Sequence, residues 1–263
     1  MLLAIDIGNT NIVLGIFDGE TLGQSWRLAT RHEGTTDELR VLVGRLFEEC
    51  SLDMKQVSGV VLSSVVPPLT ATVTEMVRQA FRQETLTIDA ANAGLPIRYH
   101  APEDVGADRL VNGLAALTLY GGAGRPVISV DFGTATTFDV ISGAGEYVGG
   151  VICPGVEISA DALFLRAARL PRVDVRRPDH LIGTSTVASM RSGLFFGYVA
   201  MVEGIVARLR DELGGDEPAV CVATGGLAGI IAGETSAIDH VSPDLTLHGL
   251  RLAWRQNTEV SHD

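Results

Sequence analysis

The stretch Leu3-Ala-Ile-Asp6-Ile-Gly8-Asn9-Thr10-Asn11 ends an apolar segment in a carboxylate, a glycine and short polar side chains, and a second apolar segment follows it. Further along the chain, Ile128-Ser-Val-Asp131-Phe-Gly133-Thr134-Ala-Thr136 repeats this order. The two aspartates lie 125 positions apart (131 minus 6), close to half of the 263 residues. The repetition predicts a duplicated domain.

Each copy has the residue types that bind a phosphate chain. The aspartate places a carboxylate at the end of a strand, glycine permits a tight turn, and Asn or Thr donates to phosphate oxygens. The turn amides form an anion nest, and the carboxylate holds a cation that neutralises the phosphates. One Asp-x-Gly alone is also typical of ordinary hairpin turns. Two copies in matching strands predict a nucleotide held between the two halves.

Composition bounds the class of protein. With 46% hydrophobic and 20% charged residues, the chain can bury the core of one large or two medium domains. A net charge of -12 argues against a general nucleic-acid-binding or anionic-membrane-binding surface. We expect no membrane-spanning stretch, and Asp6 comes too early for a signal peptide, so the predicted location is cytoplasmic.

Lysine and cysteine usage excludes several kinds of site. The only lysine, Lys55, lies in a polar segment, which excludes a P-loop and a kinase whose strand lysine binds the nucleotide. Three widely spaced cysteines, Cys50, Cys153 and Cys221, favour reduced core thiols over disulfides or a zinc site. Phosphates would therefore be bound by amides, hydroxyls, a metal ion and arginines.

The order of predicted elements repeats in the two halves. In the first half we expect strands at 2–7, 12–17, 24–29, 57–62 and 85–88, with helices near 36–47 and at 69–81. In the second half we expect strands at 127–131, 136–141, 146–151 and 219–223, with helices at 155–168, 186–213 and 245–254. This pattern predicts an α/β fold of two ribonuclease-H-like domains, at 1–118 and 119–263, with the last helix able to pack across the hinge. Each mixed sheet would be flanked by helices, as in the actin, hexokinase and heat-shock ATPase superfamily, where ATP lies in the interdomain cleft.

Two further features leave alternatives open. Asp108 and Arg109 open a helix expected to run to about residue 120, where they suit either a structural cap and a solvated ion pair, or a proton acceptor beside a carboxylate-binding guanidinium. Gly193 and Gly197, four residues apart in a long helix, permit close helix contact, either within one subunit or between two copies.

Five ordered motifs carry a family resemblance. They are Asp6-Ile-Gly-Asn-Thr-Asn11, Gly106-Ala-Asp-Arg109, Asp131-Phe-Gly-Thr-Ala-Thr136, Gly149-Gly-Val-Ile-Cys-Pro-Gly155 and Ile182-Gly-Thr-Ser-Thr186. Together they resemble the type III pantothenate kinases over nearly the whole chain. The resemblance implies ATP-dependent phosphorylation of pantothenate to 4'-phosphopantothenate, the first step of coenzyme A biosynthesis, by a homodimer.

The resemblance also implies residue roles. Asp108 matches the general base, and Asp6 matches the ligand of the Mg²⁺ in MgATP. Asp131 matches the ligand of a monovalent cation, K⁺ or NH₄⁺. The implied ATP phosphate contacts are Gly8, Asn9, Thr10, Asn11 and Thr134, and the implied pantothenate contacts are Tyr99, Gly106, Ala107, Arg109 and Thr186.

One motif departs from the family pattern. Many relatives have Gly-Lys-Asn-Thr where this chain has Gly183-Thr184-Ser185-Thr186, so the final threonine is kept and a charge is lost. Two other functions stay open: a kinase of the same fold acting on a sugar or another small hydroxy acid, and a nucleotide-binding regulatory protein. The regulatory protein would bind ATP without pantothenate-dependent ADP release.

Overall fold

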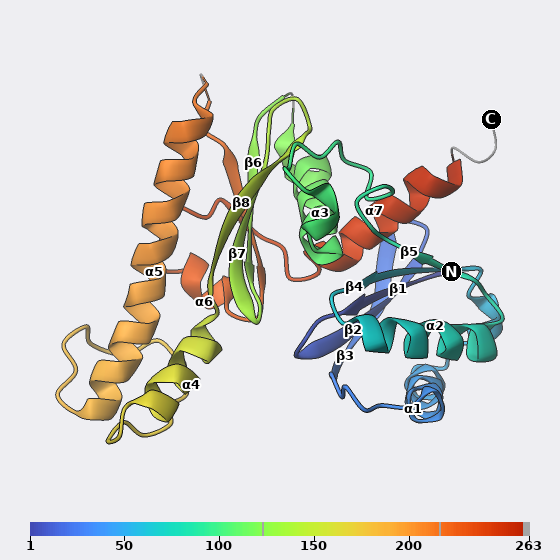
Figure 1. The fold of residues 1–263 in the computed structure, drawn as a ribbon, viewed down its shortest axis with the longest axis horizontal. Coiled ribbons are helices and arrows are strands. Elements are labelled where there is room, and N and C mark those ends of the chain that lie inside the picture. The colour runs from blue at the N-terminus through green and yellow to red at the C-terminus, as the bar shows by residue number, and fades with distance from the viewer. Residues whose placement is uncertain (123, 216, 260–263) are drawn as a thin grey trace. The chain divides into compact units, whose positions relative to one another are not determined.

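A computed structural model describes residues 1–122, 124–215 and 217–259 (Figure 1). The chain divides into two compact units. The first comprises Met1–Ala115 and the segment that begins at Thr246, and the second is Ala116–Leu245. The sequence suggested a boundary between 118 and 119, whereas the units divide after Ala115 and the last helix groups with the first unit.

The first unit contains a five-stranded mixed sheet in the order β3-β2-β1-β4-β5. β1 pairs antiparallel with β2 and parallel with β4, and β4 pairs parallel with β5. The strands are β1 (Leu2–Ile7), β2 (Asn11–Asp18), β3 (Thr21–Ala29), β4 (Gly59–Ser64) and β5 (Thr85–Thr87). The helices are α1 (Thr36–Glu49), α2 (Pro67–Phe81), α3 (Ala107–Ala116, whose last residue falls in the second unit) and α7 (Leu245–Glu259, whose first residue does).

The two faces of this sheet have different partners. Leu3, Ile5 and Ile7 of β1 belong to the core cluster formed with α1 and α2. On the other face, a Cβ at Gly15 would lie 2.7 Å from Leu247 of α7, so the missing side chain lets the helix approach the sheet. Asp6 alternates with the core residues of β1 and therefore lies on the α7 face.

The second unit repeats this connectivity. Its sheet has the order β10-β9-β6-β7-β8, with β6 antiparallel to β7 and parallel to β9. Read from β8, the sequence of pairings matches that of the first sheet read from β3, which confirms the predicted duplication. The strands are β6 (Val127–Phe132), β7 (Ala135–Ile141), β8 (Tyr147–Pro154), β9 (Val220–Gly225) and β10 (His240–Val241), and the helices are α4 (Val156–Arg166), α5 (Thr186–Leu213) and α6 (Ala228–Ala232).

Helix α5 is long and apolar enough to cross a membrane by length and composition alone, because an 18-residue window within it has a mean hydropathy of 1.4. The sequence analysis expected no membrane-spanning stretch, and this helix is the one segment of the described residues that meets the length and composition of such a stretch. In the structure, α5 runs alongside the second sheet (Figure 1) and buries side chains such as Leu194, Phe195 and Val202 in the core of that unit. Packing against the sheet accounts for the apolar residues on the buried face of the helix, and 39% of its most apolar window is buried.

Other differences from the expected elements are small. The helix expected to reach residue 120 ends at Ala116 and continues as a π-helical turn, Leu117–Gly121. The two-residue strand β10 was not expected, and α7 extends to Glu259. The start of α1 agrees with the sequence, because Thr35 and Glu38 form a capping box.

Candidate active site

Asp6 lies near the carboxyl end of β1, the central strand of the first sheet. Its direct neighbour on the parallel strand β4 is Ser63. The Ser63 hydroxyl donates to Oδ1 of Asp6 over 2.5 Å, and Ser63 itself is fully buried. Asp6 is half-buried, so the strand end presents a carboxylate whose orientation is held from the protein side.

Carbonyls of the turn after β1 accept hydrogen bonds from residues of the same unit. The Gly8 amide donates to the Asn11 carbonyl over 2.9 Å and closes the turn. Thr30 donates to the Gly8 carbonyl through its hydroxyl, over 2.7 Å, and to the Thr10 carbonyl through its amide, over 2.9 Å. Asn9 and Thr10 are exposed. A turn whose acceptors are satisfied in this way suits an anionic partner.

Asp108 lies in the first turn of α3, in the same unit as Asp6. Its Oδ1 accepts from the Arg109 amide over 2.8 Å. Protein atoms around the carboxyl raise the pKa of Asp108 through burial, while the Arg109 amide and guanidinium act in the opposite direction. An acid with a raised pKa is a better proton acceptor than an ordinary aspartate.

Gly106 leaves room for the Asp108 carboxylate. A Cβ at position 106 would lie 2.5 Å from Oδ1 of Asp108 and 3.5 Å from a methyl group of Val65. The Val65 amide in turn donates to the Ile7 carbonyl at the end of β1, over 3.0 Å. These contacts place the start of α3 next to the segment that follows β4, at the end of the sheet where Asp6 lies.

The expected pantothenate contacts of the first unit differ in exposure. Ala107 is buried, Arg109 is half-buried, and Tyr99 is 39% exposed. Arg109 and Tyr99 both take part in polar or ring contacts. Their positions leave a guanidinium and a phenol at least partly accessible in the unit that contains Asp108.

Asp131 occupies in β6 the position that Asp6 has in β1. Its register neighbour on the parallel strand is Thr224, which is buried. Gly225 follows with φ +90°, and a Cβ there would lie 2.7 Å from both Oδ1 of Asp131 and the Phe132 carbonyl. Only glycine suits this left-handed position beside the carboxylate.

Thr134 lies in the turn after β6 and is exposed. The Thr134 carbonyl occupies the space in which a Cβ of Gly155 would lie, so Gly155 permits the end of β8 to pack against this turn. The expected phosphate loop of the second unit is therefore held by the motif that ends in Gly155.

Thr186 is the first residue of α5 and is exposed. Ser185 is the N-cap, and its hydroxyl accepts from the Ala188 amide over 3.2 Å. The Ser189 hydroxyl donates to the Gly183 carbonyl over 3.2 Å. Serine is a good N-cap, so Ser185 supports the helix end that carries Thr186.

Sequence reasoning gave no role to several residues that support the site. Ser63, Val65 and Thr30 contact the expected site residues of the first unit, and Gly225 contacts Asp131. The one available signal was that matching strands of the two halves, β4 and β9, both end in small residues, at 63–64 and 224–226.

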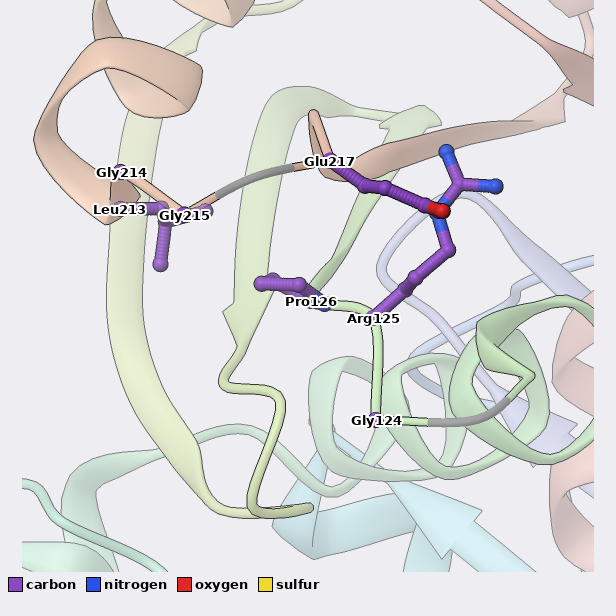
Figure 2. Close-up of a pocket in the computed structure, with 7 residues that line it drawn as sticks. All are labelled: Gly124, Arg125, Pro126, Leu213, Gly214, Gly215 and Glu217. Atoms are coloured by element: carbon purple, nitrogen blue, oxygen red, sulfur yellow. The ribbon is translucent and has the colours of Figure 1, made fainter.

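A pocket of about 440 Å³ lies elsewhere in the second unit, at the amino ends of β6 and β9 and thus at the edge of the sheet opposite to Asp131 (Figure 2). Its lining is Gly124, Arg125, Pro126, Leu213, Gly214, Gly215 and Glu217. Arg125 forms an ion pair with Glu217 over 3.0 Å. None of the expected site residues lines this pocket.

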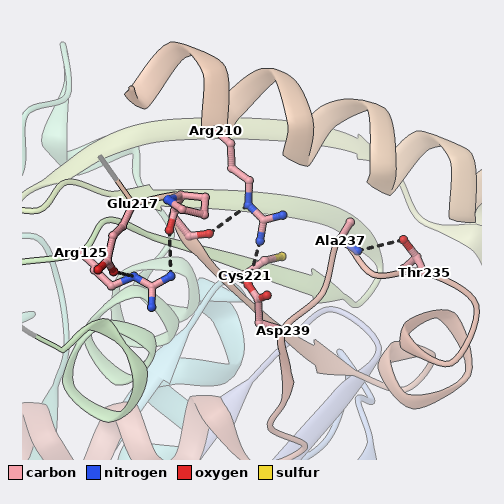
Figure 3. A network of polar contacts seen from close by, with 9 residues as sticks. Arg125, Arg210, Glu217, Cys221, Thr235, Ala237 and Asp239 are labelled. Atoms are coloured by element: carbon pink, nitrogen blue, oxygen red, sulfur yellow. Dashed lines mark hydrogen bonds and ion pairs between the residues drawn. The ribbon is translucent and has the colours of Figure 1, made fainter. Parts of the chain in front are cut away.

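A neighbouring polar network fixes the start of β9 (Figure 3). Arg210 donates to the Ala219 carbonyl over 3.0 Å and to Asp239 over 2.7 Å, and Asp239 accepts from the Cys221 amide over 2.8 Å. Burial raises the pKa of the Cys221 thiol to about 12, so this cysteine is an inert core residue, as expected. Cys50 and Cys153 are also free thiols but are only half-buried.

Comparison with known proteins identifies relatives along the whole chain. The family model for type III pantothenate kinase matches residues 2–208. A type III pantothenate kinase from Moorella thermoacetica is 53% identical over 259 residues, which cover 98% of this chain and 100% of the relative. One from Myxococcus xanthus is 50% identical over 258 residues, which cover 98% and 99%.

Solved structures at low identity share the fold. The activator of 2-hydroxyisocaproyl-CoA dehydratase from Clostridium difficile, solved with bound ADPNP, aligns with a TM-score of 0.54 at 15% identity and covers 99% of this chain and 96% of that chain. An inorganic polyphosphate/ATP-glucomannokinase from Arthrobacter aligns with a TM-score of 0.50 at 18% identity, covering 98% of each. The two mixed sheets flanked by helices are thus the duplicated ribonuclease-H-like fold of the actin, hexokinase and heat-shock ATPase superfamily. By sequence, the chain belongs to the type III pantothenate kinase family.

Proposed function

We propose that this protein transfers the γ-phosphoryl group of ATP to the primary hydroxyl of pantothenate, giving 4'-phosphopantothenate and ADP in the first step of coenzyme A biosynthesis. The membership of the family supports the reaction. The observation that carries the residue assignment is the juxtaposition in one unit of Asp6, at a strand end, and Asp108, a carboxyl whose pKa is raised by burial.

Asp108 is the general base of this proposal. Its carboxylate accepts the proton of the pantothenate hydroxyl as the oxygen forms a bond to the γ-phosphorus, and the bond between that phosphorus and the bridging oxygen of ADP breaks. Arg109, next in the chain, binds the pantothenate carboxylate. Tyr99, Gly106, Ala107 and Thr186 complete the substrate contacts.

Asp6 and the turn that follows it bind the phosphates of ATP. Among the described residues, no group of three or more His, Cys, Asp or Glu side chains is arranged to hold a metal ion. One carboxylate at a strand end fits Mg²⁺ that arrives with the nucleotide, because such Mg²⁺ takes most of its ligands from phosphates and water. When bound, Mg²⁺ neutralises charge on the phosphates. Asn9, Thr10 and Asn11 hold the phosphates through amides and short side chains, and Gly8, whose amide closes the turn on the Asn11 carbonyl, lets the phosphates approach the backbone closely.

Asp131 and Thr134 supply the contacts of the second unit. The Asp131 carboxylate, half-buried at the end of β6, offers a hard oxygen ligand that fits K⁺ or NH₄⁺ near the phosphates. Thr134 donates its exposed hydroxyl to a nucleotide phosphate. In this proposal each unit of the duplicated fold contributes one acidic strand end, Asp6 or Asp131, to nucleotide binding.

A homodimer in the cytoplasm completes the proposal. Gly193 and Gly197 of α5 are exposed, and a Cβ added at either would meet no heavy atom within 4 Å among the described residues outside the backbone of α5 itself. Exposed apolar side chains also gather between 148 and 182, namely Val148, Ile152, Ile158, Leu163, Phe164, Leu165, Leu181 and Ile182. Exposed apolar side chains and exposed glycines of this kind support a contact between two copies of the chain.

A coupled ADP-release assay tests the function. Purified protein with Mg²⁺, K⁺ and ATP should release ADP only when pantothenate is added, and mass spectrometry should detect 4'-phosphopantothenate. A panel of sugars and short hydroxy acids distinguishes the other kinases of this fold. ATP binding without pantothenate-dependent ADP release would favour a regulatory protein instead. Indifference to every monovalent cation would count against the role of Asp131.

A further inference from the structure

Ser63 makes a hydrogen bond to Asp6 and has no role in the proposed reaction. It is the fifth residue of β4 and is 0% exposed, in a strand that is otherwise apolar up to this point. Its hydroxyl donates to Oδ1 of Asp6 over 2.5 Å. A hydrogen bond to an ionised acceptor is roughly twice as strong as one between neutral groups, so this contact strongly constrains the carboxylate.

The register of the sheet explains why the two side chains meet. Asp6 and Ser63 are direct neighbours on parallel strands, 57 residues apart in sequence, and both lie on the face away from α1 and α2. The β4 backbone is further tied to β1 by the Val65 amide, which donates to the Ile7 carbonyl. The Ser63 hydroxyl is therefore held next to Asp6 by a strand of the sheet, β4, and not by a loop.

The second unit provides an internal comparison. Thr224 is the register neighbour of Asp131 and is also buried. Its hydroxyl, however, lies 3.5 Å from the Pro243 carbonyl, on a segment outside the sheet. The Ser63 hydroxyl thus donates to the carboxylate of Asp6, whereas the Thr224 hydroxyl donates to the Pro243 carbonyl. This difference fits the two ions, because Mg²⁺ demands closely defined oxygen positions.

We infer that Ser63 is a positioning residue: by holding Oδ1, it fixes the rotation of the Asp6 carboxylate and so sets the affinity for the metal-nucleotide complex. The inference rests on the proposed role of Asp6. Partners that orient a metal-binding carboxylate typically change metal affinity about 10-fold to 100-fold when they are removed. A serine that only filled space would have no such effect.

The test compares Ser63→Thr with Ser63→Val in the full chain, because these two side chains have nearly the same shape and differ in the hydroxyl. Calorimetry measures the Kd of a non-hydrolysable ATP analogue with and without Mg²⁺. The valine variant should bind about 10-fold to 100-fold more weakly than the threonine variant with Mg²⁺, and equally without it. Ser129→Ala is the matched control, since Ser129 is also 0% exposed and its hydroxyl has no hydrogen-bond partner within the described part of the chain.

Equal affinity of the two variants in Mg²⁺, or an equal loss with and without Mg²⁺, would overturn the inference. Circular dichroism and thermal melts confirm that both variants are folded, and a melting temperature that falls in both leaves their comparison intact. The binding assay contains no pantothenate. A wild-type protein that binds the metal-nucleotide complex but releases no ADP with pantothenate would refute the proposed function and leave the role of Ser63 standing.

Discussion

Replacing Asp108 with asparagine separates proton transfer from every other role of this residue. Asparagine keeps the shape of the side chain. It also keeps an acceptor oxygen for the Arg109 amide, whose nitrogen lies 2.8 Å from Oδ1 of Asp108 in the wild type. It removes the group that accepts a proton. Loss of a positioned general base typically lowers the rate 100-fold to 10,000-fold, which corresponds to about 2.7 to 5.5 kcal/mol of transition-state stabilisation.

The same substitution should maintain or raise the stability of the fold, although it lowers the rate. Burial raises the pKa of Asp108, so the folded state binds this proton more tightly than the unfolded state. Its contribution to stability is therefore largest below the unfolded pKa and decreases as the pH rises toward the raised folded pKa. At any pH above the unfolded pKa this shift lowers the stability of the fold, so Asp108→Asn should melt at the same temperature as the wild type or higher.

The assay combines the coupled ADP-release rate with calorimetric binding of the ATP analogue and a thermal melt. The expected result is a kcat reduced at least 100-fold with analogue binding and melting temperature maintained. A variant that turns over within a few-fold of the wild type would remove Asp108 from the mechanism. A variant that loses activity only because it unfolds would show that Asp108 has a structural role.

Three further predictions follow from single contacts. As the pH falls, kcat/KM should decline with a midpoint above the ordinary aspartate pKa of about 4, because the base form of Asp108 is lost at its raised pKa; a pH profile without this acid limb refutes the assignment. Gly225→Ala should destabilise the protein by more than about 1 kcal/mol, measured by urea unfolding, because φ is +90° and the added Cβ meets the Asp131 carboxylate, whereas Gly226→Ala, with nothing within 4 Å of the added Cβ, should cost less. Ser185→Ala should lower stability by about 1 kcal/mol through loss of the N-cap of α5, and Thr184→Ala, at an exposed position before it, is the control.

Local patterns predicted most of the fold. The capping residues Thr35 and Glu38 set the start of α1, and the repeated strands around Asp6 and Asp131 predicted two sheets with the same connectivity. These features depend on neighbours in the chain, so a sequence reveals them directly. The short strand β10 escaped prediction because two residues carry no periodicity.

Contacts between distant segments could not be predicted in this way. Ser63 follows an apolar run, and only the register of two strands 57 residues apart shows that it meets Asp6. Likewise, the apolar residues of α7 indicate that the helix buries one face without showing which sheet receives it. The roles of Asp108 and Arg109 came from the family resemblance, since an acid and a base at a helix start have common structural uses.

The discontinuous first unit has a consequence for biosynthesis. Its sheet is covered by Leu247 next to Gly15 and by Trp254 next to Gly59, and Asn257 donates to the Asn92 carbonyl over 2.9 Å. These partners leave the ribosome about 130 residues after Ala115, which at 5 to 20 residues per second is a delay on the order of ten seconds. During that interval one face of the nascent sheet lacks its cover, so a fragment that stops before Thr246 would expose it permanently.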